Sequence, residues 1–214
     1  MIEYPHVMPS SRAPRESCIA FLKLDGSNIR VKYTNKKGFC LFGSRTQLFD
    51  KGHPFLGESV DIFYKEYENP LVDLIEKHFS DEREVIVFLE FFGDKSFAGY
   101  HEKDDPKRLV LFDIMYGHKA RKFLLPQEFV KLTSKIGVRT APIIYQGNLT
   151  DQFIYDVKDG KYESEGVVEG VVCKGTATTG AHRGHVWMAK IKTQKYFDML
   201  NAKFGEKEAK KYGE

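Results

Sequence analysis

Apolar residues in this chain gather in short runs that are separated by turn residues, and this pattern predicts strands rather than long helices. Asn35 to Gly38 is typical of a turn between two of these runs. The predicted strands are residues 17–24, 28–33, 39–43, 85–92, 108–115, 143–145, 165–174 and 185–192. The chain is therefore expected to be rich in strands.

Helical spacing of apolar residues appears between Glu58 and Phe79, and Pro70 is predicted to divide this stretch into two helices. Further helices are predicted near Pro126, over residues 152–157, and from Gln194 to Lys211. Strands outnumber helices and are joined by turns rather than by regular crossovers. This favours an α+β fold built on antiparallel sheets over a doubly wound fold.

The composition indicates a globular protein. The 214 residues are 42% hydrophobic and 29% charged, with mixed sign and a net charge of +3. We expect a single domain over residues 1–214, with an irregular arm at 1–16 and a short helical tail at 193–214. The charge is too small to indicate nucleic acid by itself. The sequence has no long apolar segment, so we expect a cytoplasmic protein, in the host cytoplasm if its source is viral.

The three cysteines, Cys18, Cys40 and Cys173, stand far apart and in no paired spacing. Such a set fits neither a disulfide framework nor a zinc knuckle. Reduced cysteines in the core of an intracellular protein are the expected state.

The first candidate for chemistry is the sequence KLDGSN, which begins with Lys23. Strand alternation places Phe21, Lys23 and Asp25 on one face. Gly26 then permits a tight turn that brings backbone close to a ligand. Burial and neighbouring cations favour the uncharged amine of a lysine, which is its nucleophilic form. Taken alone, a surface lysine beside an Asp-Gly turn is the more frequent arrangement.

Two later strands carry charged residues. In EGVVEGVVCK both Glu165 and Glu169 are followed by Gly-Val-Val, and we favour Glu169 because Lys174 follows its repeat. A carboxylate in a buried strand needs a metal or a lysine as partner. Lys190 and Lys192 lie on one face of the last strand and are suited to phosphate. A solvated strand face is the alternative for this lysine pair.

Two apolar strands each contain one carboxylate, Glu90 and Asp113. A charge inside such a run costs several kcal/mol unless it is paired or bound to a ligand. Phe112 precedes Asp113 and offers a ring for stacking on a base, although core packing is the usual role of such a ring. Arg45 follows another strand, in the pair Ser-Arg.

Taken together and in this order, these elements resemble the motifs of the covalent nucleotidyltransferase superfamily, which comprises polynucleotide ligases and mRNA capping enzymes. The similarity covers about residues 17–200. The matching segments are KLDGSN, SR, FLEFFG, LVLFDIM, EGVVCK and KIK. The resemblance implies a ligase adenylation fold, with the nucleotide site between antiparallel sheets that are flanked by helices.

The resemblance also implies a reaction. Lys23 would attack the α-phosphate of ATP, with Mg²⁺ or Mn²⁺ present, to form lysyl-AMP. The AMP would then pass to the 5′-phosphate of a nucleic acid, and a 3′-hydroxyl would seal the strand. Lys190 and Lys192 would act on the phosphates.

Further roles come from the same resemblance. It places the metal at Glu169 and Asp25, the ribose at Glu90 and the adenine on Phe112. The remaining residues implied to bind the nucleotide are Asp25, Gly26, Asn28, Arg45 and Lys174, together with Lys190 and Lys192.

The branch of the superfamily is indicated by Asn28. DNA ligases and capping enzymes usually have arginine at this position, whereas phage-type RNA ligases that seal nicks have asparagine. Phe21 stands where DNA ligases often have glutamate. These residues favour an ATP-dependent RNA ligase that seals nicked duplex RNA. A monomer is expected.

Three alternatives remain at this stage. They are a compact DNA ligase, a capping guanylyltransferase and a binding protein that retains the scaffold. After Lys192 the chain is too short for an OB-fold or a full C-terminal domain, so we expect a truncated chain or a minimal enzyme.

Overall fold

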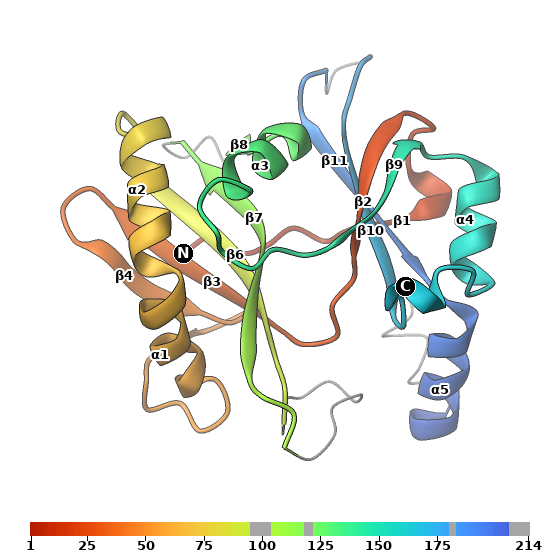
Figure 1. The fold of residues 1–214 in the computed structure, drawn as a ribbon, viewed down its shortest axis with the longest axis horizontal. Coiled ribbons are helices and arrows are strands. Elements are labelled where there is room, and N and C mark those ends of the chain that lie inside the picture. The colour runs from red at the N-terminus through yellow and green to blue at the C-terminus, as the bar shows by residue number, and fades with distance from the viewer. Residues whose placement is uncertain (95–103, 118–121, 180–182, 206–214) are drawn as a thin grey trace. The chain divides into compact units, whose positions relative to one another are not determined.

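The computed structural model describes residues 1–94, 104–117, 122–179 and 183–205. The chain divides into two compact units. Unit 1 comprises Met1–Pro5 and Asp25–Thr140, and unit 2 comprises His6–Leu24 and Ala141–Glu214. Within the described residues each unit contains one sheet (Figure 1).

The sheet of unit 1 has six strands in the order β5-β4-β3-β6-β7-β8, and all neighbours are antiparallel. The strands are β3 Ser27–Thr34, β4 Gly38–Gly43, β5 Leu48–Phe49, β6 Glu84–Phe92, β7 Arg108–Tyr116 and β8 Lys122–Phe123. The helices are α1 Gly57–Glu66, α2 Glu68–His78 and α3 Pro126–Thr133. The predicted antiparallel arrangement is confirmed for this sheet.

Helices α1 and α2 lie along one face of this sheet (Figure 1). Alternate residues of the central strands, among them Ile29, Val31 and Leu89, have no exposed surface. The hydroxyl of Tyr67, between the two helices, donates hydrogen bonds to the backbone oxygens of Leu109 and Arg139. The opposite face of the sheet carries Asn28, Arg30 and Glu90 together with a second buried apolar cluster that includes Ile86 and Phe88.

The prediction that Pro70 separates the two helices is wrong. The break lies at Tyr67, whose N–H donates to the Phe63 oxygen at the end of α1. Pro70 is the third residue of α2. The backbone N–H at that position has no partner within the helix, so proline does not interrupt it.

The sheet of unit 2 has five strands in the order β1-β11-β10-β2-β9. Strands β1 and β11 are parallel and the other neighbours are antiparallel. The strands are β1 Met8–Pro9, β2 Ser17–Leu22, β9 Ile143–Asn148, β10 Gly170–Thr176 and β11 Val186–Lys192. The helical elements are η1 Ser10–Arg12, α4 Asp151–Lys158, η2 Glu163–Glu165 and α5 Gln194–Phe204.

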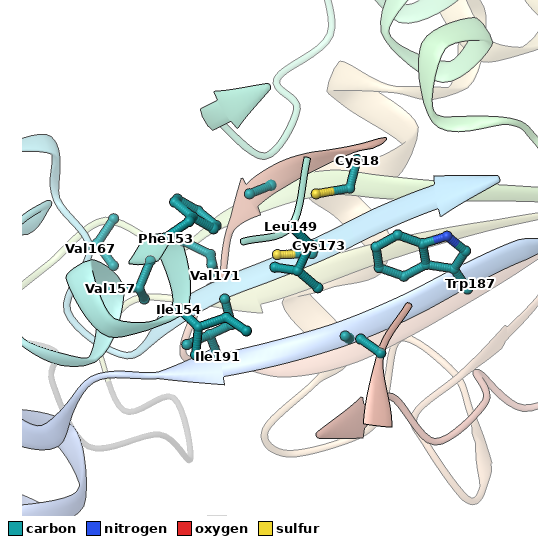
Figure 2. Close-up of a cluster of buried hydrophobic side chains, with 13 residues drawn as sticks. Cys18, Leu149, Phe153, Ile154, Val157, Val167, Val171, Cys173, Trp187 and Ile191 are labelled. Atoms are coloured by element: carbon teal, nitrogen blue, oxygen red, sulfur yellow. The ribbon is translucent and has the colours of Figure 1, made fainter. Parts of the chain in front are cut away.

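The core of unit 2 lies between this sheet and α4. Figure 2 shows Phe153, Ile154 and Val157 of α4 beside Val171 and Ile191 of β10 and β11. The same cluster contains Cys18 and Cys173. All three cysteines carry free thiols, as predicted. One face of β10 and β11 is thus committed to the core.

Three segments of unit 2 differ from the prediction. The expected irregular arm contains β1 and the short helix η1. The strand expected over residues 165–174 begins only at Gly170, because η2 precedes it and ends at Gly166 with φ of +83°. Helix α5 ends at Phe204, and residues 206–211 of the expected helix lie outside the described residues. No helix in the described part of the chain has the length and apolarity to cross a membrane.

Candidate active site

A buried carboxylate joins two lysines in unit 2. The Glu169 Oε1 atom lies 2.8 Å from Lys23 Nζ and 3.0 Å from Lys192 Nζ. The exposed fractions are 4% for Glu169, 7% for Lys192 and 25% for Lys23. Of the three side chains, that of Lys23 is thus the most accessible to a substrate.

Backbone contacts fix the position of this cluster. The Lys23 N–H donates to the Gly170 oxygen at 2.9 Å, and the Thr193 N–H donates to the Glu169 oxygen at 3.0 Å. The Thr193 hydroxyl donates to the Val168 oxygen at 2.6 Å. Gly170 has φ of +149°, and a Cβ there would collide with the Ile191 carbonyl. Glycine therefore lets β10 approach β11 beside the carboxylate.

Three lysines share a sheet face in this unit. Val171 and Ile191 belong to the core, so Lys190 and Lys192 project from the opposite face of the sheet. The Lys174 amine is buried, 5.2 Å from the centre of the Phe21 ring. Together with Lys23 these lysines outnumber the single glutamate, so the face favours anions such as phosphates.

The structure distinguishes the two glutamates that the sequence left open. Glu165 lies in η2 and is exposed, whereas Glu169 is buried and contacts both lysines. The Oε2 atom of Glu169 is buried and accepts no hydrogen bond from described residues. An oxygen of this kind fits a metal ion or a water bound to one.

Glu169 would supply one carboxylate to such an ion. No group of three His, Cys, Asp or Glu side chains able to hold a metal occurs among the described residues. Magnesium commonly binds through one or two carboxylates, substrate phosphates and water, which agrees with this small set. Asp25, the other predicted metal residue, is half-buried and belongs to unit 1.

Three of the predicted nucleotide-binding residues lie together in unit 1. Asn28 of β3 and Glu90 of β6 are direct partners across the sheet. A Cβ on Gly26 would lie 2.6 Å from the Phe91 oxygen and 3.0 Å from Glu90 Cγ, so only glycine fits there. The Asn28 Oδ1 atom is buried and accepts no hydrogen bond from the described residues.

Phe112 and Asp113 lie on β7, next to β6. The buried Asp113 accepts a hydrogen bond of 2.6 Å from the Tyr4 hydroxyl, which explains a carboxylate inside an apolar strand. Burial raises the pKa of Tyr4 well above its ordinary value, and the charges of Asp113 and Glu90 raise it further. Tyr4 therefore stays protonated and remains a donor.

Arg45 belongs to unit 1. Its side chain is exposed in the turn after β4, which is closed by a hydrogen bond of 2.8 Å from the Ser44 N–H to the Gln47 oxygen.

Sequence reasoning missed Tyr4, Gly170 and Thr193. The charge of Asp113 called for a partner, but nothing in the sequence identified Tyr4. The Thr-Gln start of α5 was a recognisable helix cap, and the Thr193 oxygen does accept from the Tyr196 N–H.

Comparison with known proteins bears on the family and the fold of the chain. A family model described as RNA ligase matches residues 16–192. No curated protein matches the chain. Several solved structures of the RNA ligase of Naegleria gruberi are similar in fold, with the chain covering 58% of each of the three described here.

The three structures carry different ligands. A mutant with AMP and Mn has a TM-score of 0.68 and 18% identity over 92% of this chain. A mutant with ATP and Mn has a TM-score of 0.68 and 19% identity over 92% of this chain. The protein with pyrophosphate has a TM-score of 0.67 and 17% identity over 93% of this chain. At these identities the similarity establishes the fold alone, and it confirms the predicted α+β ligase fold.

Proposed function

Because this chain belongs to the RNA ligase family, we propose that it joins RNA 3′-hydroxyl and 5′-phosphate ends through a covalent lysyl-AMP intermediate on Lys23. The observation that carries the proposal is the pairing of a partly exposed lysine, at the end of β2, with the buried Glu169 on a face rich in lysines. This chain covers 58% of the length of the similar Naegleria ligase structures. The RNA-joining activity is therefore a proposal for this chain.

The first step is attack on ATP. The uncharged amine of Lys23 forms a P–N bond to the α-phosphorus and loses a proton to solvent. The bond to the bridging oxygen breaks, so that pyrophosphate leaves with the electron pair. Lys190 and Lys192 neutralise charge on the phosphates, as preorganised cations do in phosphoryl transfer.

Two further steps transfer and release AMP. A 5′-phosphate oxygen of RNA attacks the lysyl-AMP phosphorus, the P–N bond breaks, and the nitrogen takes up a proton from solvent, which restores the Lys23 amine. The 3′-hydroxyl of the neighbouring strand then attacks the activated 5′-phosphate and loses its proton, and AMP leaves.

Unit 1 is proposed to hold the nucleoside. Glu90 accepts a hydrogen bond from a ribose hydroxyl, and the Asn28 Oδ1 atom is a second buried acceptor beside it. Gly26 permits close approach to the backbone, and Phe112 stacks on the adenine. The exposed guanidinium of Arg45 is suited to a phosphate.

Glu169 is the proposed ligand for Mg²⁺ or Mn²⁺, through its Oε2 atom, with Asp25 as a further candidate. A divalent cation there would supply positive charge to the phosphates during transfer. The ATP, AMP and Mn in the Naegleria ligase structures belong to that protein and support the same choice here.

Intact mass after incubation with ATP and Mg²⁺ tests the covalent step. The wild type should gain the mass of one AMP and Lys23→Ala should not. Lys32→Ala is a matched control, because Lys32 is 22% exposed and pairs with Glu84 at 2.5 Å, and this variant should still gain AMP. Absence of an adduct on the wild type, or an adduct on Lys23→Ala, would contradict the proposed nucleophile.

Nicked duplexes then test the substrate. We expect sealing of a nick with a ribose 3′-end and weak sealing of an all-DNA nick. Equal sealing of both would favour a DNA ligase, and labelling by GTP in place of ATP would indicate a capping-type guanylyltransferase.

A further inference from the structure

The N-terminal segment Met1–Pro5 is attached to the sheet of unit 1 at two points. Arg30 of β3 donates a hydrogen bond of 3.0 Å from its Nη1 atom to the Met1 oxygen. Tyr4 donates its hydroxyl to Asp113 of β7 at 2.6 Å. Arg30 is only 3% exposed and Asp113 only 2%, so both anchors are buried in the unit. The segment has neither helix nor strand, as predicted for an irregular arm, and it is nevertheless part of this sheet's packing.

The Tyr4 ring packs edge-on against three phenylalanines. The ring centres lie 5.0 Å from Phe88, 5.1 Å from Phe112 and 5.6 Å from Phe123, with interplanar angles of 66°, 85° and 80°. Edge-to-face contacts of this kind restrict the orientation of both rings. Phe112 thus has a neighbour that limits its rotation.

Phe112 needs such a neighbour because it lies in a β-bulge. Phe88 of β6 pairs with Asp113, and the next residue, Leu89, pairs with Leu111. Phe112 is the extra residue between these pairs. In a regular strand Phe112 and Asp113 would project to opposite faces, yet Tyr4 contacts both. A bulged residue lacks a direct partner in the ladder, so its side chain depends on packing for its orientation.

We propose that Tyr4 is a positioning residue for the nucleotide, which fixes the orientation of the Phe112 ring. This inference rests on the proposed function, which assigns the adenine to Phe112. The hydrogen bond to Asp113 holds the Tyr4 ring in place, and the ring in turn holds Phe112. Tyr4 acts on the base only through its neighbour, and Lys190 and Lys192, which are proposed for the phosphates, belong to unit 2.

Equilibrium binding in the Lys23→Ala background tests this role without the covalent step. ATP and inorganic triphosphate are titrated by calorimetry, because only ATP carries the base. Tyr4→Leu should weaken ATP binding about tenfold and leave triphosphate binding within about twofold. Tyr4→Phe keeps the ring and loses only the hydroxyl, so its effect on ATP should be smaller.

A control and a double variant separate positioning from general loosening. Tyr64→Leu also removes a tyrosine from unit 1, one that packs on Phe42 and Phe63 and donates to the Phe39 oxygen at 3.2 Å. It should leave the affinity for ATP unchanged. When Phe112 is already Leu, Tyr4→Leu should weaken ATP binding no further, because its effect passes through Phe112.

Several results would overturn the inference. They are an unchanged ATP affinity in Tyr4→Leu, an equal loss for ATP and triphosphate, and an additive loss in the Phe112→Leu background. If Tyr4→Leu does not fold, Tyr4→Phe and Asp113→Leu serve instead, because each removes the hydrogen bond that holds the Tyr4 ring, and unchanged ATP affinity in both would overturn it equally. Failure of the proposed function is distinct, since it appears as a wild type that forms no adduct.

Discussion

Replacing Glu169 by Gln should strongly destabilise unit 2, in the absence of any nucleotide. The substitution keeps the shape of the side chain and removes the charge that Lys23 and Lys192 share. Both amines contact the same Oε1 atom, at 2.8 Å and 3.0 Å. After the change, two cations face each other across a neutral amide.

The expected magnitude follows from these distances. At an effective dielectric constant of about 20, each pair attracts by roughly 5–6 kcal/mol before desolvation is counted. Removing one partner of a buried ion pair costs about 3–5 kcal/mol, because the remaining charge stays buried. Lys23 is 25% exposed and can recover some hydration, so the lower end applies. A loss of about 3 kcal/mol corresponds to a fall in Tm of roughly 6–12 °C.

Calorimetric melting and urea unfolding of the unliganded protein measure this loss. Glu163→Gln is the matched control in the same unit, since the Glu163–Lys195 pair is 56% and 67% exposed. An exposed pair of this kind contributes at most about 1 kcal/mol. Lys192→Met added to Glu169→Gln should restore stability relative to the sum of the single effects, because it removes one of the two facing cations.

Two outcomes would refute the reasoning. One is a loss for Glu169→Gln no larger than for the exposed control. The other is additivity within about 0.5 kcal/mol between Glu169→Gln and Lys192→Met, since contacting residues should be coupled.

Three further variants test the supporting structure. Gly170→Ala should prevent stable folding of unit 2 because its Cβ would collide with β11. Gly166→Ala, at φ of +83° with open space around it, should lower the unfolding free energy by only about 1 kcal/mol. Similar melting curves for both variants would contradict the close approach of β10 to β11. Thr193→Ala should lower the unfolding free energy by about 2 kcal/mol, because it removes the cap of α5 and the hydrogen bond to the Val168 oxygen. Thr150→Ala removes only the cap of α4 and should lower it by about 1 kcal/mol. Urea unfolding measures both losses, and equal losses would argue against a contribution from the bond to Val168. Burial raises the pKa of Tyr67, so its contribution to stability is complete below pH about 10 and declines as the pH rises further, when the unfolded state ionises first. Above pH 10 the unfolding free energy of Tyr67→Phe should therefore fall less with pH than that of the wild type. Identical slopes of unfolding free energy against pH would contradict this.

The strands were predictable because burial of a sheet face requires runs of apolar residues in the sequence. The apolar runs that predicted β2, β6, β7 and β11 are those that line the two sheets. Burial also decided between Glu165 and Glu169, where the repeated tetrapeptide could not. The lysines of β11 followed from simple alternation, with Ile191 in the core.

Other features had no local signal. The bulge at Phe112 is invisible in the sequence, because Leu-Phe-Asp-Ile reads equally well as a regular strand. Tyr4 meets its partner 109 residues away. The prediction of a helix break at Pro70 was wrong because the start of α2 was misplaced. Proline breaks the interior of a helix but is tolerated in its first turn, where Pro70 lies.

The two units stabilise a buried carboxylate in a similar way. Each buries a carboxylate where an isolated charge would be unfavourable, Asp113 within β7 of unit 1 and Glu169 directly before β10 of unit 2. In each, a residue outside the strands secures the arrangement: Thr193 holds the backbone of Glu169, and Tyr4 binds the side chain of Asp113. The strands set the spacing, and these flanking residues set the orientation. Substitutions at such residues should therefore change the geometry of the proposed site without removing any group that contacts substrate.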